Sequence, residues 1–348
     1  MTKLKSITCF LLSFTFITQC YLSTGQAQKD VIGTNEIKAK PYSDVFPALY
    51  QRVLKEKLQD KYMIKLSNKQ LEKTLIITIN GKLEIVNNNG ETINSIDLKS
   101  MRVGKLSETN IKWSPDGKNM IFLATNLTSG KISWYIMNVD GTLKEILKNE
   151  QALQPTWAPD NEHIAFIRIM RGVPGANIFI KNIFSGKETS ICESGGGNPQ
   201  WFNHHSKILY KKMKDPFGHS KDQDLFVFDV ARKNHTKILD GPIFITYPPI
   251  SPDDSKILVC VGSKTRIIDT NGQLLKEFEI IVTGDPLWSP NSDFIAYLKA
   301  KIEGDPGVIE SQHIYLLDTL TGSIKNLTPI SYLVIESFQW YNNNTIIY

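Results

Sequence analysis

The chain has 348 residues, of which 41% are hydrophobic and 10% aromatic, and its formal net charge is +5. These values are ordinary for a globular protein, and the length suffices for a large buried core. So mild a basic charge says little about partners and argues against nucleic-acid binding.

The N-terminus predicts export. Lys3 and Lys5 precede an apolar stretch over residues 7–17, and a small-residue site ends at Ala27. This order is typical of a secretory signal peptide over residues 1–27, which is removed from the mature protein. We therefore expect a periplasmic protein.

Lipid anchoring through Cys20 is the alternative. It fits less well, because Gln19 stands where lipoprotein processing expects a small residue. No second long apolar segment follows, so we expect no transmembrane span in the mature chain. Loss of the two leader lysines takes the formal net charge from +5 to +3.

Residues 28–70 read as an N-terminal extension. Within it, residues 45–61 place apolar side chains at rough helical spacing, which predicts a short helix. Residues 74–98 then contain short runs rich in Ile, Leu, Val and Thr, typical of strands.

A five-residue phrase recurs along the remainder of the chain. Its copies read WSPDG at 113–117, WAPDN at 157–161, ISPDD at 250–254 and WSPNS at 288–292, with weaker copies WFNHH at 201–205 and WYNNN at 340–344. The copies begin 44, 44, 49, 38 and 52 residues apart. Self-similarity at such a period is the signature of a propeller or solenoid.

Each copy is followed by three short strand-like runs, and Asx-Gly or Ser-Gly pairs often separate the last two. Glycine accepts a positive φ in such hairpin turns. One unit is thus a four-stranded antiparallel sheet, and several around an axis make a β-propeller. We expect this domain over residues 71–348.

The phrase itself has a structural interpretation. The tryptophans would fill the space between neighbouring sheets, and the aspartates would cap backbone N–H groups of the turn. These repeat residues are Trp113, Asp116, Trp157, Asp160, Trp201, Asp253, Trp288 and Trp340. The functional alternative is a ring of carboxylates for metal binding or catalysis.

The blade count follows from the ends of the chain. Five complete units, with one blade shared between residues 74–98 and the C-terminal run 340–348, give six blades. Seven is the alternative if residues 40–98 form a blade of their own. A shared blade removes exposed sheet edges.

The WSPDG phrase and the run WYIMNVDG at 134–141 resemble the TolB-type propeller repeat over residues 74–348. The resemblance implies a propeller that docks a peptidoglycan-associated lipoprotein. Similar repeats occur in propeller domains of prolyl-oligopeptidase-like enzymes and in some sugar lyases. We expect the TolB α/β domain to be missing, because the segment between the predicted leader and the first strand is too short for it.

The mature chain keeps two cysteines, Cys192 and Cys260. We expect them on strands two blades apart, too far for a disulfide. Both should be buried free thiols.

The working surface should be the face that carries the connections between the second and third strands of each unit, because their predicted lengths vary most. This face also carries basic residues, which predict binding of an envelope protein or a cell-wall glycan; a solvated rim of mixed charge is the alternative. The basic residues are Arg168, Arg171, Lys211, Lys212, Lys214, Lys299 and Lys301.

Catalytic motifs are weak. His219 with Asp222 and Asp224 is the first candidate for a metal site, but HExxH, CxxC and G-x-S-x-G are absent. We therefore expect a non-enzymatic, monomeric scaffold without a cofactor. The alternative is a lyase-like, carbohydrate-active enzyme that uses the mouth of the channel.

Overall fold

The computed structural model describes residues 37–45, 48, 64–66, 74–77, 82–87, 89, 91–106, 111–147, 152–169, 176–192, 196–215, 223–243, 249–282, 285–303, 308–328, 335 and 338–348. The predicted signal peptide, Cys20 and most of the predicted helix lie outside these ranges. A four-residue helix, α1 (Tyr42–Val45), falls at the start of that helical segment.

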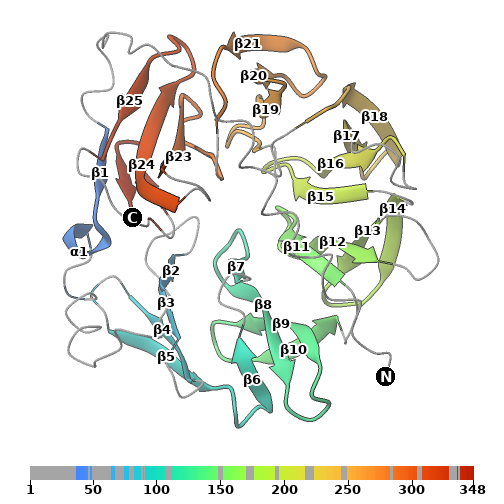
Figure 1. The fold of residues 1–348 in the computed structure, drawn as a ribbon. Helices are drawn as coiled ribbons and strands as arrows, with labels where there is room; N and C mark the ends of the chain where they lie inside the picture. The colour runs from blue at the N-terminus through green and yellow to red at the C-terminus, as the bar shows by residue number, and fades with distance from the viewer. Residues whose placement is uncertain are drawn as a thin grey trace, which may run out of the picture.

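The described strands form seven sheets arranged around a centre (Figure 1). The first three sheets are β2 (Ile64–Leu66), β3 (Thr74–Ile77), β4 (Lys82–Val86), β5 (Thr92–Asp97); β6 (Val103–Leu106), β7 (Lys112–Trp113), β8 (Asn119–Asn126), β9 (Ile132–Asn138), β10 (Leu143–Leu147); and β11 (Ala152–Trp157), β12 (His163–Ile169), β13 (Ala176–Asn182), β14 (Glu188–Cys192). The next three are β15 (Gly196–Trp201), β16 (Lys207–Met213), β17 (Gln223–Asp229), β18 (Asn234–Leu239); β19 (Ile257–Val261), β20 (Lys264–Ile268), β21 (Leu274–Phe278); and β22 (Leu287–Trp288), β23 (Phe294–Glu303), β24 (Val308–Asp318), β25 (Ile324–Asn326). The seventh is β26 (Gln339–Asn342), β27 (Thr345–Ile347) and β1 (Lys38–Lys40).

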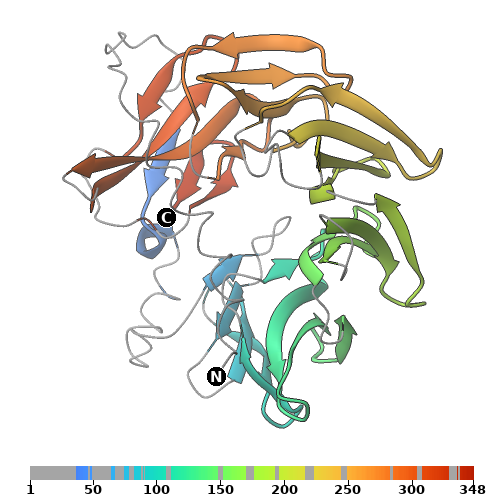
Figure 2. The same ribbon diagram turned by 45° about the vertical axis from the view of Figure 1, so that its right-hand side comes forward.

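Neighbouring strands within these sheets are antiparallel, except that β1 runs parallel to β27. In most sheets the first strand lies toward the centre and the last at the periphery, whereas in the second sheet β7 rather than β6 lies toward the centre (Figure 1). The sheets are twisted (Figure 2). Such twist is the normal consequence of right-handed strands. The all-β prediction is confirmed by these strands.

The sheets pack face to face, so both faces of a strand are buried. On β12, Ile164 and Phe166 pack toward β9, whereas Ala165 between them joins the core shared with β16. All three side chains are 0% exposed. This two-sided burial explains why the strands are continuous apolar runs rather than alternating ones.

Directly paired aromatic residues recur on the second and third strands of four sheets. The pairs are Phe122–Tyr135, Phe166–Phe179, Tyr210–Phe226 and Tyr297–Tyr315, with ring centroids 5.5–5.8 Å apart. Cross-strand aromatic pairs stabilise antiparallel sheets and fill the space between layers.

The repeated tryptophans connect consecutive sheets. Their indole N–H groups donate to a carbonyl of the preceding sheet: Trp157 to Lys112 at 3.2 Å, Trp288 to Pro249 at 3.0 Å and Trp340 to Leu287 at 3.2 Å. Each acceptor directly precedes the first residue of the previous copy of the phrase. The phrase therefore sets the spacing between neighbouring inner strands.

Trp201 differs from these three. Its indole nitrogen is buried and, among the described residues, has no hydrogen-bond partner. The two sheets are instead joined by the Thr156 hydroxyl of β11, which donates to the Pro199 carbonyl of β15 at 3.2 Å.

The aspartates of the phrase accept hydrogen bonds within their own turns. Asp253 accepts from the Ser251 hydroxyl at 2.5 Å and the Ser255 N–H at 3.0 Å. Burial alone would raise the pKa of Asp253, but these donors and the nearby Lys256 ammonium outweigh it and lower the pKa to about 2. Asp116 is held similarly, by the Ser114 hydroxyl at 2.6 Å. These carboxylates are occupied by the turn.

The turn after Trp201 has no aspartate of its own, and Asp254 of the next sheet enters it instead. Its carboxylate accepts the N–H groups of Asn203 and His204, each at 2.7 Å, and lies 2.9 Å from Nδ1 of His205. Asp254 has φ 61°, a value that glycine more often adopts. The degenerate copy of the phrase is thus completed by its neighbour.

The shared blade expected from the sequence requires a correction. The described strands of residues 64–97 form a four-stranded sheet, and none of them pairs with the C-terminal strands. The chain ends do share a sheet, but the N-terminal contribution is β1, whose Lys38 pairs with Thr345. The described strands form seven sheets, and the first of these strands begin before residue 71.

Cys192 and Cys260 are both buried thiols, on β14 and β19 of different sheets. Their predicted burial is confirmed. Cys260 lies 3.5 Å from the Thr265 hydroxyl, within its own sheet.

The tryptophan hydrogen bonds lead to a matched pair of variants. Trp288→Phe removes an indole N–H that has a partner and should lower the free energy of unfolding by about 1 kcal/mol more than the lost ring area alone. Trp201→Phe removes a buried N–H that has no hydrogen-bond partner, so its effect on the free energy of unfolding should be close to neutral or stabilising. Chemical denaturation measures both, and equal losses would contradict the proposed role of the hydrogen bond.

The shared sheet leads to a second prediction. Deletion of residues 339–348 removes β27, whose Ile346 and Ile347 are 0% and 1% exposed, and leaves β1 without its partner. We expect a marked fall in melting temperature. An unchanged melting temperature would contradict closure through this sheet.

Candidate functional site

The two ends of the sheets differ, and we name them by their connections. The loop end carries the connections between the second and third strands and those between sheets, and the turn end carries the phrase and the third-to-fourth hairpins. Strands are counted within each repeat unit, in which the segment that carries the phrase is the first. At the loop end, the connection between the second and third strands of a unit ranges from two residues between β19 and β20 to nine between β16 and β17.

These connections are shorter than the sequence suggested, because the strands continue further. Arg168 belongs to β12, Lys211 and Lys212 to β16, and Lys299 and Lys301 to β23. Because these strands continue into basic residues, the apolar pattern in the sequence did not show where each strand stops.

Arg168 is held by its own sheet. Its Nη1 donates to Glu188 at 2.9 Å, and its guanidinium carbon lies 5.0 Å and 4.6 Å from the ring centroids of Phe166 and Phe179. Lys181 binds the other carboxylate oxygen of Glu188 at 2.9 Å. Burial would raise the pKa of Glu188, but these two cations lower it overall.

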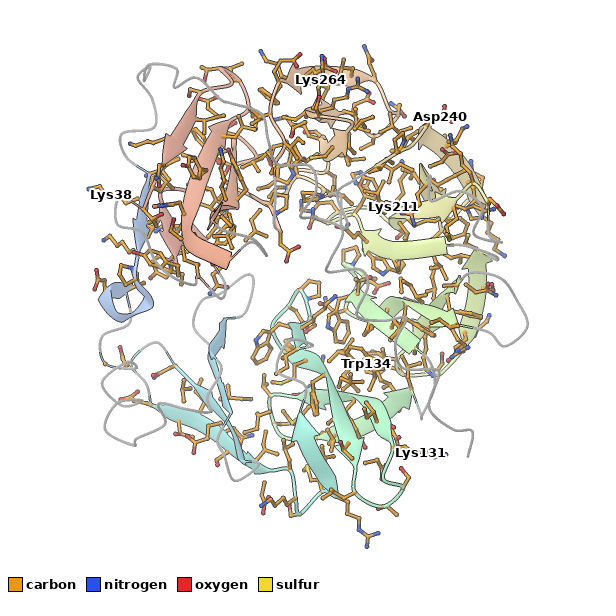
Figure 3. The ribbon with its side chains drawn as sticks, in the orientation of Figure 1. Lys38, Lys131, Trp134, Lys211, Asp240 and Lys264 are labelled. Carbon is orange, nitrogen blue, oxygen red and sulfur yellow. The ribbon has the colours of Figure 1, made fainter. Side chains whose placement is uncertain are left out.

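Lys211 is buried rather than on a rim. Its side chain is 6% exposed, and it pairs with Gly197 on β15, which has no side chain to cover it. Burial lowers the pKa of Lys211 to about 8. In Figure 3 it lies on the β15–β18 sheet, away from the periphery.

Lys214 and Asp224 face each other across the β16–β17 hairpin. The carboxylate of Asp224 lies 3.4 Å from the Lys214 ammonium and 3.7 Å from that of Lys237, and it accepts the Gly241 N–H at 3.0 Å. A carboxylate so occupied is a poor metal ligand. Its proposed metal partners His219 and Asp222 lie outside the described residues.

Lys212 lies near a hydrogen-bonded pair of rings. The Tyr210 hydroxyl and His235 Nδ1 are 2.9 Å apart, and the Phe228 ring centroid lies 4.5 Å from that of His235. Burial first, and then the Lys212 charge, lower the pKa of His235. This arrangement favours a neutral imidazole.

Lys299 has its ammonium 5.7 Å from the Tyr315 ring centroid. Arg168, Lys212 and Lys299 each follow by two residues an aromatic residue of the paired series, so they occupy one repeated position on three different sheets. They are distributed over three sheets rather than gathered in one patch. Arg171 is outside the described residues, and the side chain of Lys301 is not described.

Sequence reasoning missed an apolar patch at the loop end. It consists of Met101, Leu127 and Ile132, which are 40%, 53% and 59% exposed. The Leu127 N–H donates to the Arg102 carbonyl at 2.8 Å, which joins the β8–β9 hairpin to the connection after β5. The available signal was the leucine inside the turn 127–131.

Two cations border this apolar patch. Arg102 and Lys131 are both exposed, and Lys131 lies at the periphery of the molecule (Figure 3). An apolar centre with a basic edge can bind a protein surface of the opposite pattern.

The described residues hold no group of three or more His, Cys, Asp or Glu side chains arranged for a metal ion. Within the same residues, no helix is both long and apolar enough to span a membrane. His313 is engaged locally, with Nδ1 2.9 Å from the Thr328 carbonyl.

Comparison with known proteins gives fold likeness only. No protein-family model matches the chain, and no curated protein matches it. Among solved structures, a prolyl endopeptidase has a TM-score of 0.54 at 13% identity, covering 76% of this chain and 41% of its own. An oligogalacturonate lyase determined in complex with manganese has a TM-score of 0.50 at 13% identity, covering 82% and 76%.

A TolB protein from Agrobacterium tumefaciens is also similar, with a TM-score of 0.43 at 15% identity, covering 77% of this chain and 80% of its own. At these identities the likeness concerns the propeller architecture alone. The chain spans less than half of the endopeptidase, so that enzyme's activity does not transfer with the fold.

The buried lysine leads to a prediction on pH. Because the folded-state pKa of Lys211 is lowered to about 8, the unfolded chain binds more protons above that pH. Stability should therefore rise between about pH 8 and the ordinary lysine pKa of about 10.4, by at most roughly 3 kcal/mol. Lys211→Met should lack this rise, as denaturation at pH 7.5 and 10 can measure. Parallel pH profiles for the two proteins would contradict the buried position.

Proposed function

We propose that this protein is an exported, non-enzymatic β-propeller scaffold that binds an envelope protein through its loop end. The observation that carries the proposal is the apolar patch of Met101, Leu127 and Ile132 with Arg102 and Lys131 at its edge. Exposed apolar patches with polar borders mark interaction sites.

The binding surface proposed here differs from the basic rim expected from the sequence. Arg168 and Lys214 each form an ion pair within the fold, and Lys211 is buried. Apolar contact should therefore supply the affinity, and Arg102 and Lys131 should steer an acidic partner.

Export rests on the N-terminal sequence, with its two lysines, apolar stretch and small-residue cleavage site. The propeller we propose has seven blades, one for each described sheet, with the chain ends joined by β1 and β27. The TolB-type phrase supports an envelope role by resemblance.

The carbohydrate-active alternative has less support. Its metal-dependent form would use His219, Asp222 and Asp224, and Asp224 is already engaged by two lysines and a backbone N–H. The likeness to the oligogalacturonate lyase adds the fold and no catalytic residue.

Affinity capture tests the proposal. The purified protein is used as bait on a cross-linked envelope fraction, beside the variant Leu127→Ser/Ile132→Ser. We expect one enriched envelope protein, at least about tenfold reduced with the variant, because two apolar anchors are lost from the contact. The melting temperature should be unchanged, since both side chains are exposed.

The control is Leu320→Ser, which alters an exposed leucine at the opposite end of the sheets. Capture that is unaffected by the double variant, or reduced equally by the control, would exclude the apolar patch as the binding surface.

A further inference from the structure

The β23–β24 hairpin of the sixth sheet is longer than the strands of the fifth sheet, which precedes it in the ring (Figure 1). β23 and β24 have ten and eleven residues, whereas β19 and β20 have five each and are joined by a two-residue turn. A difference of this size corresponds to about 16–20 Å of strand. The fifth sheet therefore covers only part of the hairpin.

Lys299 marks the end of the covered part. On the face of β23 that packs on the fifth sheet, Ile295 and Tyr297 are 0% and 4% exposed and belong to the shared core. Lys299 follows Tyr297 by two residues and is exposed. Its ammonium lies 5.7 Å from the Tyr315 ring centroid, and within the described part of the chain it forms no ion pair.

The equivalent cation of the third sheet binds a carboxylate of its own sheet. Arg168 occupies the position of Lys299, two residues beyond an aromatic residue of the paired series. Its guanidinium lies on the rings of that sheet and donates to Glu188 on β14 at 2.9 Å. This contact shows which group satisfies a cation at the repeated position.

The sixth sheet has no carboxylate at the corresponding place. Glu188 pairs with the residue just before Asn182, whose side chain holds the turn that follows β13. Asp318 holds the same kind of turn after β24, and the residue just before it pairs with Ile324. An isoleucine thus stands where the third sheet has its glutamate, so the carboxylate for Lys299 has to come from elsewhere.

The residue opposite Lys299 adds a hydrogen-bond acceptor. His313 pairs directly with Lys299, which places their Cβ atoms about 5 Å apart. His313 Nδ1 lies 2.9 Å from the Thr328 carbonyl, and because a carbonyl only accepts, Nδ1 carries the hydrogen. In the neutral imidazole Nε2 then has the lone pair. The hydrogen bonds of His313 to other described residues all involve Nδ1.

We propose that this part of the β23–β24 hairpin binds a small hydroxycarboxylate, with its carboxylate on the Lys299 ammonium and its hydroxyl donating to His313 Nε2. The carboxylate takes the part that Glu188 has on the third sheet. The acceptor nitrogen beside the ammonium selects a carboxylate that carries a donor next to it. The half-buried Tyr315 ring lies beneath the cation. The site is separate from the apolar patch and does not depend on an envelope partner.

Ligand-observed NMR with the purified full chain tests the proposal with three molecules of similar shape. Lactate has both groups, propionate lacks the hydroxyl, and 1,2-propanediol lacks the carboxylate. We expect lactate to bind at least about tenfold more tightly than either, because each of the others leaves one protein group without its partner. Lys299→Met should weaken lactate binding about tenfold or more, since it removes the charge and keeps an unbranched side chain.

A second variant tests the acceptor. His313→Phe keeps an aromatic ring but has no acceptor nitrogen, so it should bind lactate and propionate equally. A preference for lactate that persists in this variant would contradict the role of Nε2. If the variant does not fold, Lys299→Met still tests the site, because Lys299 is exposed and its replacement should leave the melting temperature unchanged.

The matched control is Lys187→Met, which removes an exposed lysine at the turn end and should bind lactate as the unaltered protein does. The proposal is overturned if lactate does not bind, or if propionate or 1,2-propanediol binds equally well. Lactate binding that is unaffected by Lys299→Met, or reduced equally by Lys187→Met, would overturn it too.

Discussion

The structure depends on contact between the faces of neighbouring sheets, fixed at the inner strands by the tryptophans of three repeats, Trp157, Trp288 and Trp340. An indole N–H that reaches the carbonyl before the previous anchor joins two sheets by one directional bond, while the ring fills the space between them. The turn that follows is held by its own serine and aspartate. Where the phrase degenerates at residues 201–205, the missing carboxylate comes from Asp254 of the next sheet.

This constraint determines which residues remain for binding. A cation two residues beyond an aromatic pair lies against rings of its own sheet, as Arg168 and Lys299 do. Positive charge near the ends of strands therefore contributes first to packing. The residues left for a partner are those that the repeat does not use, such as the exposed apolar residues at the loop end.

The sequence predicted the architecture well because the repeat encodes it locally. Strand length, the hairpin turns and the periodic tryptophan need only near neighbours, and the two cysteines were correctly placed as buried. The positions of the basic residues were predicted less well. Lys211 is charged and lies near a loop in sequence, yet it is 6% exposed, because its strand continues and a glycine on the adjacent strand leaves room above it. Burial of this kind depends on the neighbouring strand, which no local pattern reports.

The sequence by itself determined that the chain is a series of small β-sheets, most of which follow a copy of the phrase, since that information is repeated every few dozen residues. Only the tertiary structure decided which distant segments of the chain pair with each other. A three-residue strand, β1, pairs in parallel with β27 near the other terminus, and residues 64–97 form a separate sheet. Pairing between distant segments depends on which strand edge is left open, and that edge exists only once the other sheets have assembled.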